Sequence, residues 1–149
     1  MELLSSRERK FIEDRLRSQY DIEDFENLIL IKAGRGRIRA TTEETLRLAS
    51  RLKGVQQIGL YVMKISDGSL ALSVEGSQLL NKKIRKNIVE VDEDLAIEWM
   101  KASPIKLDEK VGGRYVVARC GELYLGSGRV SRDGKIYPQI AKWRRIPES

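Results

Sequence analysis

The sequence predicts an α+β fold in two small units: an N-terminal α/β unit with a mostly antiparallel sheet, then a small β-barrel. Two observations predict this class. Short apolar runs of strand length are separated by glycine-containing turns, and helical segments with apolar stripes lie between them. Neighbouring strands are joined by tight turns rather than by βαβ crossovers. At 149 residues the chain has room for one domain or two very small ones. We predict units at 1–84 and 85–149.

The N-terminal unit is expected to begin with a helix at residues 3–20 and to continue with two strand pairs separated by a second helix. A strand at 27–34 turns at Gly34 and Gly36 and returns as "RIRATT". A helix starts after Thr42 and stops at Gly54. Strands at 55–65 and 70–74 flank Asp67-Gly68, a strong hairpin signal, and a short helix follows at 75–84. The apolar positions expected to face inward on the two longer helices are Leu4, Phe11, Ile12, Leu16, Tyr20, Leu46, Ala49 and Leu52.

The C-terminal unit is expected to be richer in strands. A strand at 84–91 leads into a helix at 92–102 capped by Asp92. The segments "YVVARC" and "LYLGSGRV" form a hairpin around Gly121-Glu122, and "GKIYP" and "IAKWRRI" read as two further strands. Short strands with turns this close together indicate a small, partly closed barrel.

Composition excludes several functions. The chain has no histidine and one cysteine, which removes Ser-His-Asp and Cys-His catalysis, histidine metal sites and zinc sites. "AGRGRIR" lacks the spacing of a phosphate-binding loop and is interpreted as a tight turn, although Arg35, Arg37 and Arg39 could still contact phosphates. We therefore expect no enzymatic activity, no cofactor and no metal. No apolar run approaches the ~20 residues that span a bilayer, and the charged N-terminal segment does not resemble a signal peptide, so we expect a cytoplasmic protein without membrane partners.

Charge is the first positive indication of function. The net charge is +6, and it is uneven: residues 1–30 hold five basic and eight acidic side chains, whereas residues 31–149 hold 23 basic and 14 acidic ones. A basic body attracts polyanions, because each neutralised phosphate releases counterions. The basic stretch "NKKIRKN" and the C-terminal tail supply the candidates, with aromatic rings interleaved that could stack on unpaired bases. For Trp143 alone, a cap on the core is the favoured interpretation. The candidate RNA-binding residues are Lys82, Lys83, Arg85, Lys86, Gly126, Gly128, Arg129, Arg132, Lys135, Lys142, Trp143, Arg144 and Arg145.

The motifs "WMKASPI", "GGRYVVA", "LYLGSGRV" and "YPQIAKWRR" resemble PUA-type RNA-binding domains, in particular the PUA-like tail of sun-family RNA cytosine-C5 methyltransferases. The segment from "LRLASRLKG" to "NIVEV" resembles the pre-PUA domain of the Nip-type ribosome-biogenesis proteins. The resemblance implies a non-catalytic adaptor for structured RNA, ribosomal or transfer, that works with an RNA methyltransferase or a ribosome-assembly factor. It also implies that Gly126 and Gly128 lie at or near the RNA surface. The alternative is a protein–protein scaffold in which RNA contact is incidental.

Overall fold

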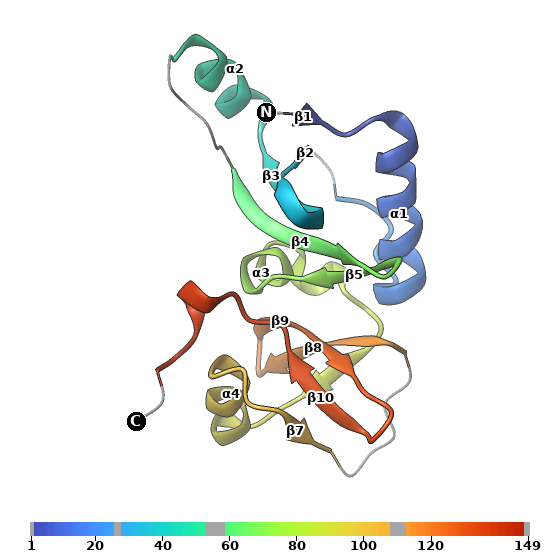
Figure 1. Ribbon diagram of the computed structural model, residues 1–149, viewed down its shortest axis with the longest axis vertical. Coiled ribbons are helices and arrows are strands. Elements are labelled where there is room, and N and C mark those ends of the chain that lie inside the picture. The colour runs from blue at the N-terminus through green and yellow to red at the C-terminus, as the bar shows by residue number, and fades with distance from the viewer. Residues whose placement is uncertain (1, 26–27, 53–58, 108–112, 148–149) are drawn as a thin grey trace.

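A computed structural model of the chain describes residues 2–25, 28–52, 59–107 and 113–147. They form two five-stranded sheets with helices packed against them, so the predicted α+β class is confirmed (Figure 1). The first sheet has the order β1-β2-β3-β4-β5 and is antiparallel throughout. Its strands are β1 (Glu2–Leu3), β2 (Ile29–Lys32), β3 (Arg37–Thr41), β4 (Leu60–Ser66) and β5 (Ser69–Leu72).

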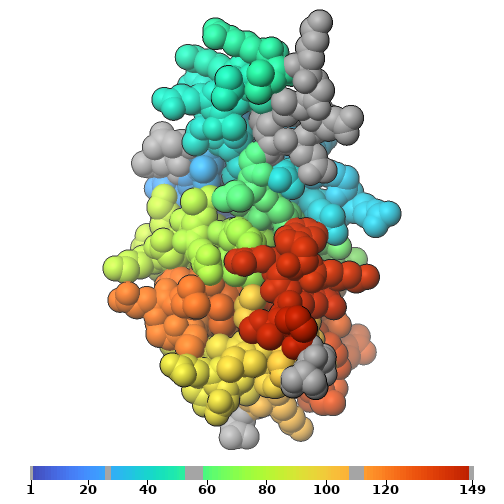
Figure 2. Space-filling view, turned by 90° about the vertical axis from the view of Figure 1, so that its left-hand side faces the viewer, coloured from blue at the N-terminus to red at the C-terminus, as the bar shows by residue number. Residues whose placement is uncertain are grey.

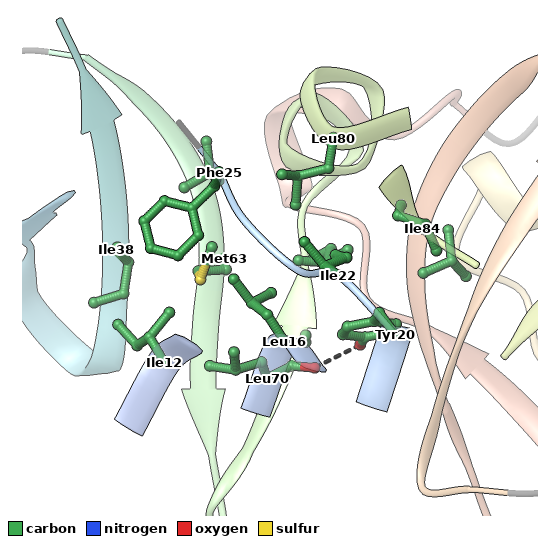
Figure 3. Close-up of a cluster of buried hydrophobic side chains, with 14 of the residues drawn as sticks. Ile12, Leu16, Tyr20, Ile22, Phe25, Ile38, Met63, Leu70, Leu80 and Ile84 are labelled. Atoms are coloured by element: carbon green, nitrogen blue, oxygen red, sulfur yellow. Dashed lines mark hydrogen bonds between the residues drawn. The ribbon is translucent and has the colours of Figure 1, made fainter. Parts of the chain in front are cut away.

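Helix α1 (Ser6–Tyr20) covers one face of the first sheet (Figures 1 and 3). Ser5 caps it and Glu8 completes a capping box, which fixes where the helix begins. Leu3, expected in the helix, instead forms β1 together with Glu2 and pairs with β2. The apolar stripe is largely as predicted, because Ile12, Leu16 and Tyr20 are buried and the two remaining positions are half-buried.

Two shorter helices belong to the same half. α2 (Glu43–Arg51) begins after its cap Thr42, as predicted, but of the expected inward positions only Ala49 is buried and Leu52 is 53% exposed. The predicted stop at Gly54 lies outside the described residues. α3 (Val74–Leu80) follows the β4–β5 hairpin, whose turn residues Asp67 and Gly68 both have positive φ, as a tight hairpin turn requires.

The second sheet has the order β6-β8-β9-β10-β7 and curls into an open half-barrel. Its hairpin from β8 to β9 is as predicted, and so is the Asp92 cap of α4. The expectation that tight turns join all neighbouring strands is wrong for β6. This strand pairs in parallel with β8, and the connection between them passes through α4 and β7. The elements are β6 (Ile88–Glu90), α4 (Glu93–Met100), β7 (Ile105–Lys106), β8 (Tyr115–Cys120), β9 (Leu123–Val130) and β10 (Lys135–Pro138).

The C-terminal segment corrects a second expectation. "IAKWRRI" is not a strand: after the buried Ile140, residues Lys142–Arg144 form a single 3₁₀ turn, η3. The physical reason is the lack of an apolar face, since residues 142–147 are all exposed, and the backbone N–H of Ile146 bonds to the carbonyl oxygen of Met100 rather than to a strand. Trp143 is 64% exposed, so the expectation that it caps the core is wrong.

The two sheets meet in a buried contact that we call the seam, formed by Tyr20, Leu70, Leu72 and Ser127. The Leu72 N–H donates to Ser127 Oγ (2.8 Å), Ser127 Oγ lies 2.9 Å from the Tyr20 hydroxyl, and that hydroxyl donates to the Leu70 carbonyl oxygen (2.6 Å; Figure 3). β8 and β9 also contribute three side chains to the core beneath α1: Tyr115, Val117 and Tyr124. The two halves are therefore packed together as expected, and a domain boundary at residue 84 stays a prediction.

Candidate nucleic-acid interface

Two adjoining hollows lie between β3 and β4 of the first sheet and the C-terminal segment: an upper hollow of about 660 Å³ and a lower hollow of about 510 Å³. They share the side chains of Arg35, Arg37, Tyr61 and Trp143, so we treat them as one feature, the basic groove. In Figure 2 the C-terminal segment (red) lies beside residues 33–40 (cyan) on one face of the molecule. The groove is defined by the side chains of Arg35, Arg37, Arg39, Tyr61, Lys64, Glu75, Lys142, Trp143 and Arg145.

The β3–β4 ladder places the cations of the first sheet. Arg37 lies opposite Lys64 and Arg39 lies opposite Tyr61 in the register. Directly opposed like charges destabilise a pair of strands, so the Arg37–Lys64 pair contributes nothing to holding the ladder together. Arg35 stands in the left-handed region (φ 61°) within the turn of residues 34–36, and its exposed side chain lines both hollows.

An aromatic and cationic cluster joins the two halves at the groove. The rings of Tyr61 and Trp143 meet edge to face, with centroids 6.2 Å apart at 61°. The guanidinium carbon of Arg37 lies 5.7 Å from the Tyr61 centroid and 5.9 Å from that of Trp143, within reach of cation–π attraction. The indole is thus positioned by two neighbours while most of its surface stays in solvent.

The groove cations have few acidic neighbours. Glu75 supplies the one carboxylate among the described residues that line the groove, and it is bonded to Arg144. No ion pair within 4.0 Å joins five of the cations to a carboxylate of the described chain: Arg35, Arg37, Lys64, Lys142 and Arg145. Their positive charge therefore remains available to an anionic ligand.

Burial raises the pKa of the Tyr61 phenol. The positive charge of Arg37 lowers it and the negative charge of Glu75 raises it, but burial has the largest effect. The phenol therefore stays protonated at neutral pH and keeps its O–H as a hydrogen-bond donor.

The predicted tail residues divide into two sets. Lys142, Trp143 and Arg145 line the groove, and Arg144 stands beside it with its guanidinium on Glu75. The other set lies on the β9–β10 hairpin and lines neither hollow, although Arg129 is opposite Tyr115, a residue that lines the lower hollow. Arg129 also lies 5.1 Å from the Tyr137 ring centroid. The exposed members of this hairpin set are Arg129, Arg132 and Lys135.

The structure does not bring the cations of "NKKIRKN" to the groove. Lys83 is paired with Asp24 at 3.0 Å, and Lys86 Nζ donates to the Ser18 carbonyl oxygen at 3.0 Å. Lys82 lines a separate hollow with Arg119, at the C-terminal end of α3. Lys82, Lys83, Arg85 and Lys86 are all exposed, but they do not form one surface with the tail.

Gly126 and Gly128 lie in the interior, so the expectation that they face RNA needs correction. A Cβ on Gly128 would lie 2.5 Å from Trp99 Cη2 and 2.6 Å from Ile136 Cγ2. Gly126 has φ +83° and approaches the backbone of residues 72–74, and its N–H donates to Ser77 Oγ at 2.9 Å. The two glycines allow β9 to pack closely on α4 on one side and on the first half on the other.

Sequence reasoning missed Tyr61, Lys64 and Glu75 as members of the site. The alternation of apolar and polar residues along β4 would have placed Lys64 on a polar face. No local signal, however, connects that strand to the C-terminal segment some 80 residues later. The arginines of "GRGRIR" were weighed for phosphate contact, and the structure brings all three of them to the groove.

The described residues contain no cluster of acidic and cysteine side chains that could hold a metal ion, and no helix among them is long and apolar enough to cross a membrane. No protein-family model matches the chain, and no curated protein matches it. The resemblance to PUA-type and pre-PUA domains therefore stays a prediction.

Proposed function

We propose that the basic groove binds structured RNA and that the protein is a non-catalytic adaptor in the maturation or modification of ribosomal or transfer RNA. One observation carries the proposal: cations without acidic partners, from both halves of the chain, surround an exposed tryptophan. Proteins that bind nucleic acids combine such phosphate-contacting cations with an aromatic platform for unpaired bases.

The proposal extends to partners and location. As an adaptor, the protein would work in the cytoplasm with an RNA methyltransferase or a ribosome-assembly factor. The support here is the resemblance alone. The PUA-like identity of the C-terminal half belongs to the same proposal, and the curled open sheet agrees with it without distinguishing it from other small barrels.

The test is the salt dependence of binding to a transcribed RNA hairpin with an unpaired loop. One variant carries Arg37→Gln, Lys142→Gln and Arg145→Gln. A matched control removes the same charge from exposed positions on α1, through Arg7→Gln, Lys10→Gln and Arg15→Gln. If each groove cation contacts a phosphate, the slope of log K against log salt should flatten by about 2 for the groove variant, and affinity should fall at least about tenfold. The control variant should keep most of the salt dependence and most of the affinity of the native protein.

Equal behaviour of the two variants would show that only net charge matters, and absence of salt-dependent binding would contradict the proposal. Those outcomes would favour a protein–protein scaffold instead. One observation supports that alternative: Leu48 and Leu52, on α2 and at its C-terminal end, are each more than half exposed, and so is Leu60 at the start of β4. Scattered exposed leucines are common on soluble proteins, so we place this function second.

A further inference from the structure

The upper hollow of the groove has features that a site for phosphate alone would not need. Its volume of about 660 Å³ is in the range of small-ligand pockets. Three arginines line it, but Tyr61, Trp143 and Glu75 line it as well. Glu75 is the acceptor in this lining of arginines and aromatic rings, so it suits a ligand group that donates hydrogen bonds.

Trp143 offers a surface on which a base can stack. Its indole is 64% exposed, and its orientation is set by the edge contact with Tyr61 and by the Arg37 guanidinium. Stacking on an aromatic ring accepts any base, because every base has a π face. Trp143 therefore provides affinity for an unpaired base but does not discriminate among the four bases.

Glu75 can select among the four bases. It stands in the first turn of α3, its side chain is 27% exposed, and one of its oxygens accepts from Arg144 Nε. An ionised carboxylate has about four lone-pair positions, so the pair with Arg144 leaves acceptor capacity on a residue that lines the hollow. Among the four bases, guanine alone presents two adjacent N–H donors, at N1 and N2, to a carboxylate. Adenine, cytosine and uracil each present one.

We propose that the upper hollow is a subsite for an unpaired guanine, which stacks on Trp143 while Glu75 accepts hydrogen bonds from its Watson–Crick edge. This inference rests on the proposed RNA binding and names the base that the same groove selects. Arg35 and Arg39, on the rim of the hollow, then face the flanking phosphates.

The test uses single-stranded RNA undecamers of five uridines, one test base and five uridines, with binding measured by fluorescence anisotropy. The native protein should bind the guanine undecamer about tenfold more tightly than the adenine, cytosine or all-uridine undecamer, as expected for one bidentate base contact. Glu75→Gln should reduce this preference to about twofold or less. Arg144→Gln breaks the same ion pair but keeps the carboxylate, so it should retain the preference and is the matched control.

Tryptophan fluorescence gives a second readout. Trp99 is fully buried, so quenching by added RNA reports on Trp143. Quenching should be strong for the guanine undecamer and absent in Trp143→Leu, which should bind all four RNAs about tenfold more weakly. Thermal unfolding of each variant checks that it folds.

The outcomes separate the inference from the proposed function. Salt-dependent binding without preference among the four RNAs would overturn guanine selection and leave RNA binding in place. A preference that survives Glu75→Gln would overturn the role of Glu75. If no undecamer and no hairpin RNA binds, both proposals are wrong.

Discussion

The seam and the basic groove are built from the same two halves of the chain, yet their chemistry is opposite. In the seam, Tyr20 and Ser127 are fully buried and their hydroxyls take part in a continuous chain of hydrogen bonds. No buried side-chain polar atom among the described residues lacks a partner. In the groove, an indole is exposed and two cations stand opposite each other across a ladder.

This difference separates stability from function. Buried polar groups are paired because leaving one unpaired is costly, so the seam holds the two sheets in one arrangement. The groove contributes little to the stability of the fold, and repulsion between Arg37 and Lys64 lowers that stability. The α1 surface shows the ordinary use of charge, since Arg9 pairs with Glu13 and Lys32 with Glu8. We infer that the seam fixes the positions of cations that a ligand then uses.

The seam should respond most strongly to loss of one hydroxyl. Ser127→Ala removes the acceptor of the Leu72 N–H and should lower the free energy of unfolding by about 1–3 kcal/mol, because the N–H stays buried without that partner. Urea denaturation measures the change. Ser50→Ala, at an exposed position on α2, is the control and should stay within about 0.5 kcal/mol of the native protein. Equal effects would show that the seam is not a stabilising contact.

The seam should also weaken in alkali. Burial raises the pKa of Tyr20 well above its ordinary value of 10.0. Above about pH 10 the unfolded chain loses this proton while the native chain keeps it, so the free energy of unfolding should fall by up to about 1.4 kcal/mol per pH unit. Below that pH the group contributes no pH dependence.

Urea denaturation between about pH 8 and pH 11.5 measures this slope. Tyr20→Phe should flatten it, because the variant lacks the buried phenol. An unchanged slope in Tyr20→Phe would contradict the assignment.

The smallest change in the free energy of unfolding is expected in the groove, where a substitution should stabilise the protein. Lys64→Gln removes the repulsion from Arg37 and should raise the free energy of unfolding by about 0.2–1 kcal/mol at low salt. The gain should shrink in 1 M salt, where charges are screened. The same variant should weaken RNA binding. Lys10→Gln, on α1, is the control, and a destabilised Lys64→Gln would show that the pair is not repulsive in the native state.

Much of the fold could be predicted from the sequence, because its signals are local. A cap, a turn or an apolar stripe depends on residues within a few positions of one another. The Asp67-Gly68 hairpin, the cap of α4 by Asp92 and the β8–β9 hairpin were all predicted from such signals, and the structure has them.

The candidate site could be predicted only in part. The tail cations Lys142 and Arg145 were recognised from composition, but their neighbours were not. Whether a glycine such as Gly128 faces solvent or a tryptophan side chain depends on what packs over the strand. The same holds for Trp143, whose exposure follows from the absence of a strand where one was expected.

By itself the sequence determined the local elements, the α+β class and the excess of positive charge after residue 30, since each follows from composition or from residues adjacent along the chain. Only the tertiary structure decided that β6 pairs in parallel with β8, that the glycines of β9 are buried, and that arginines near residue 37 meet the tail near residue 143. The physical reason is that these contacts join segments far apart in the chain, and packing between the two sheets, rather than periodicity within one segment, selects them.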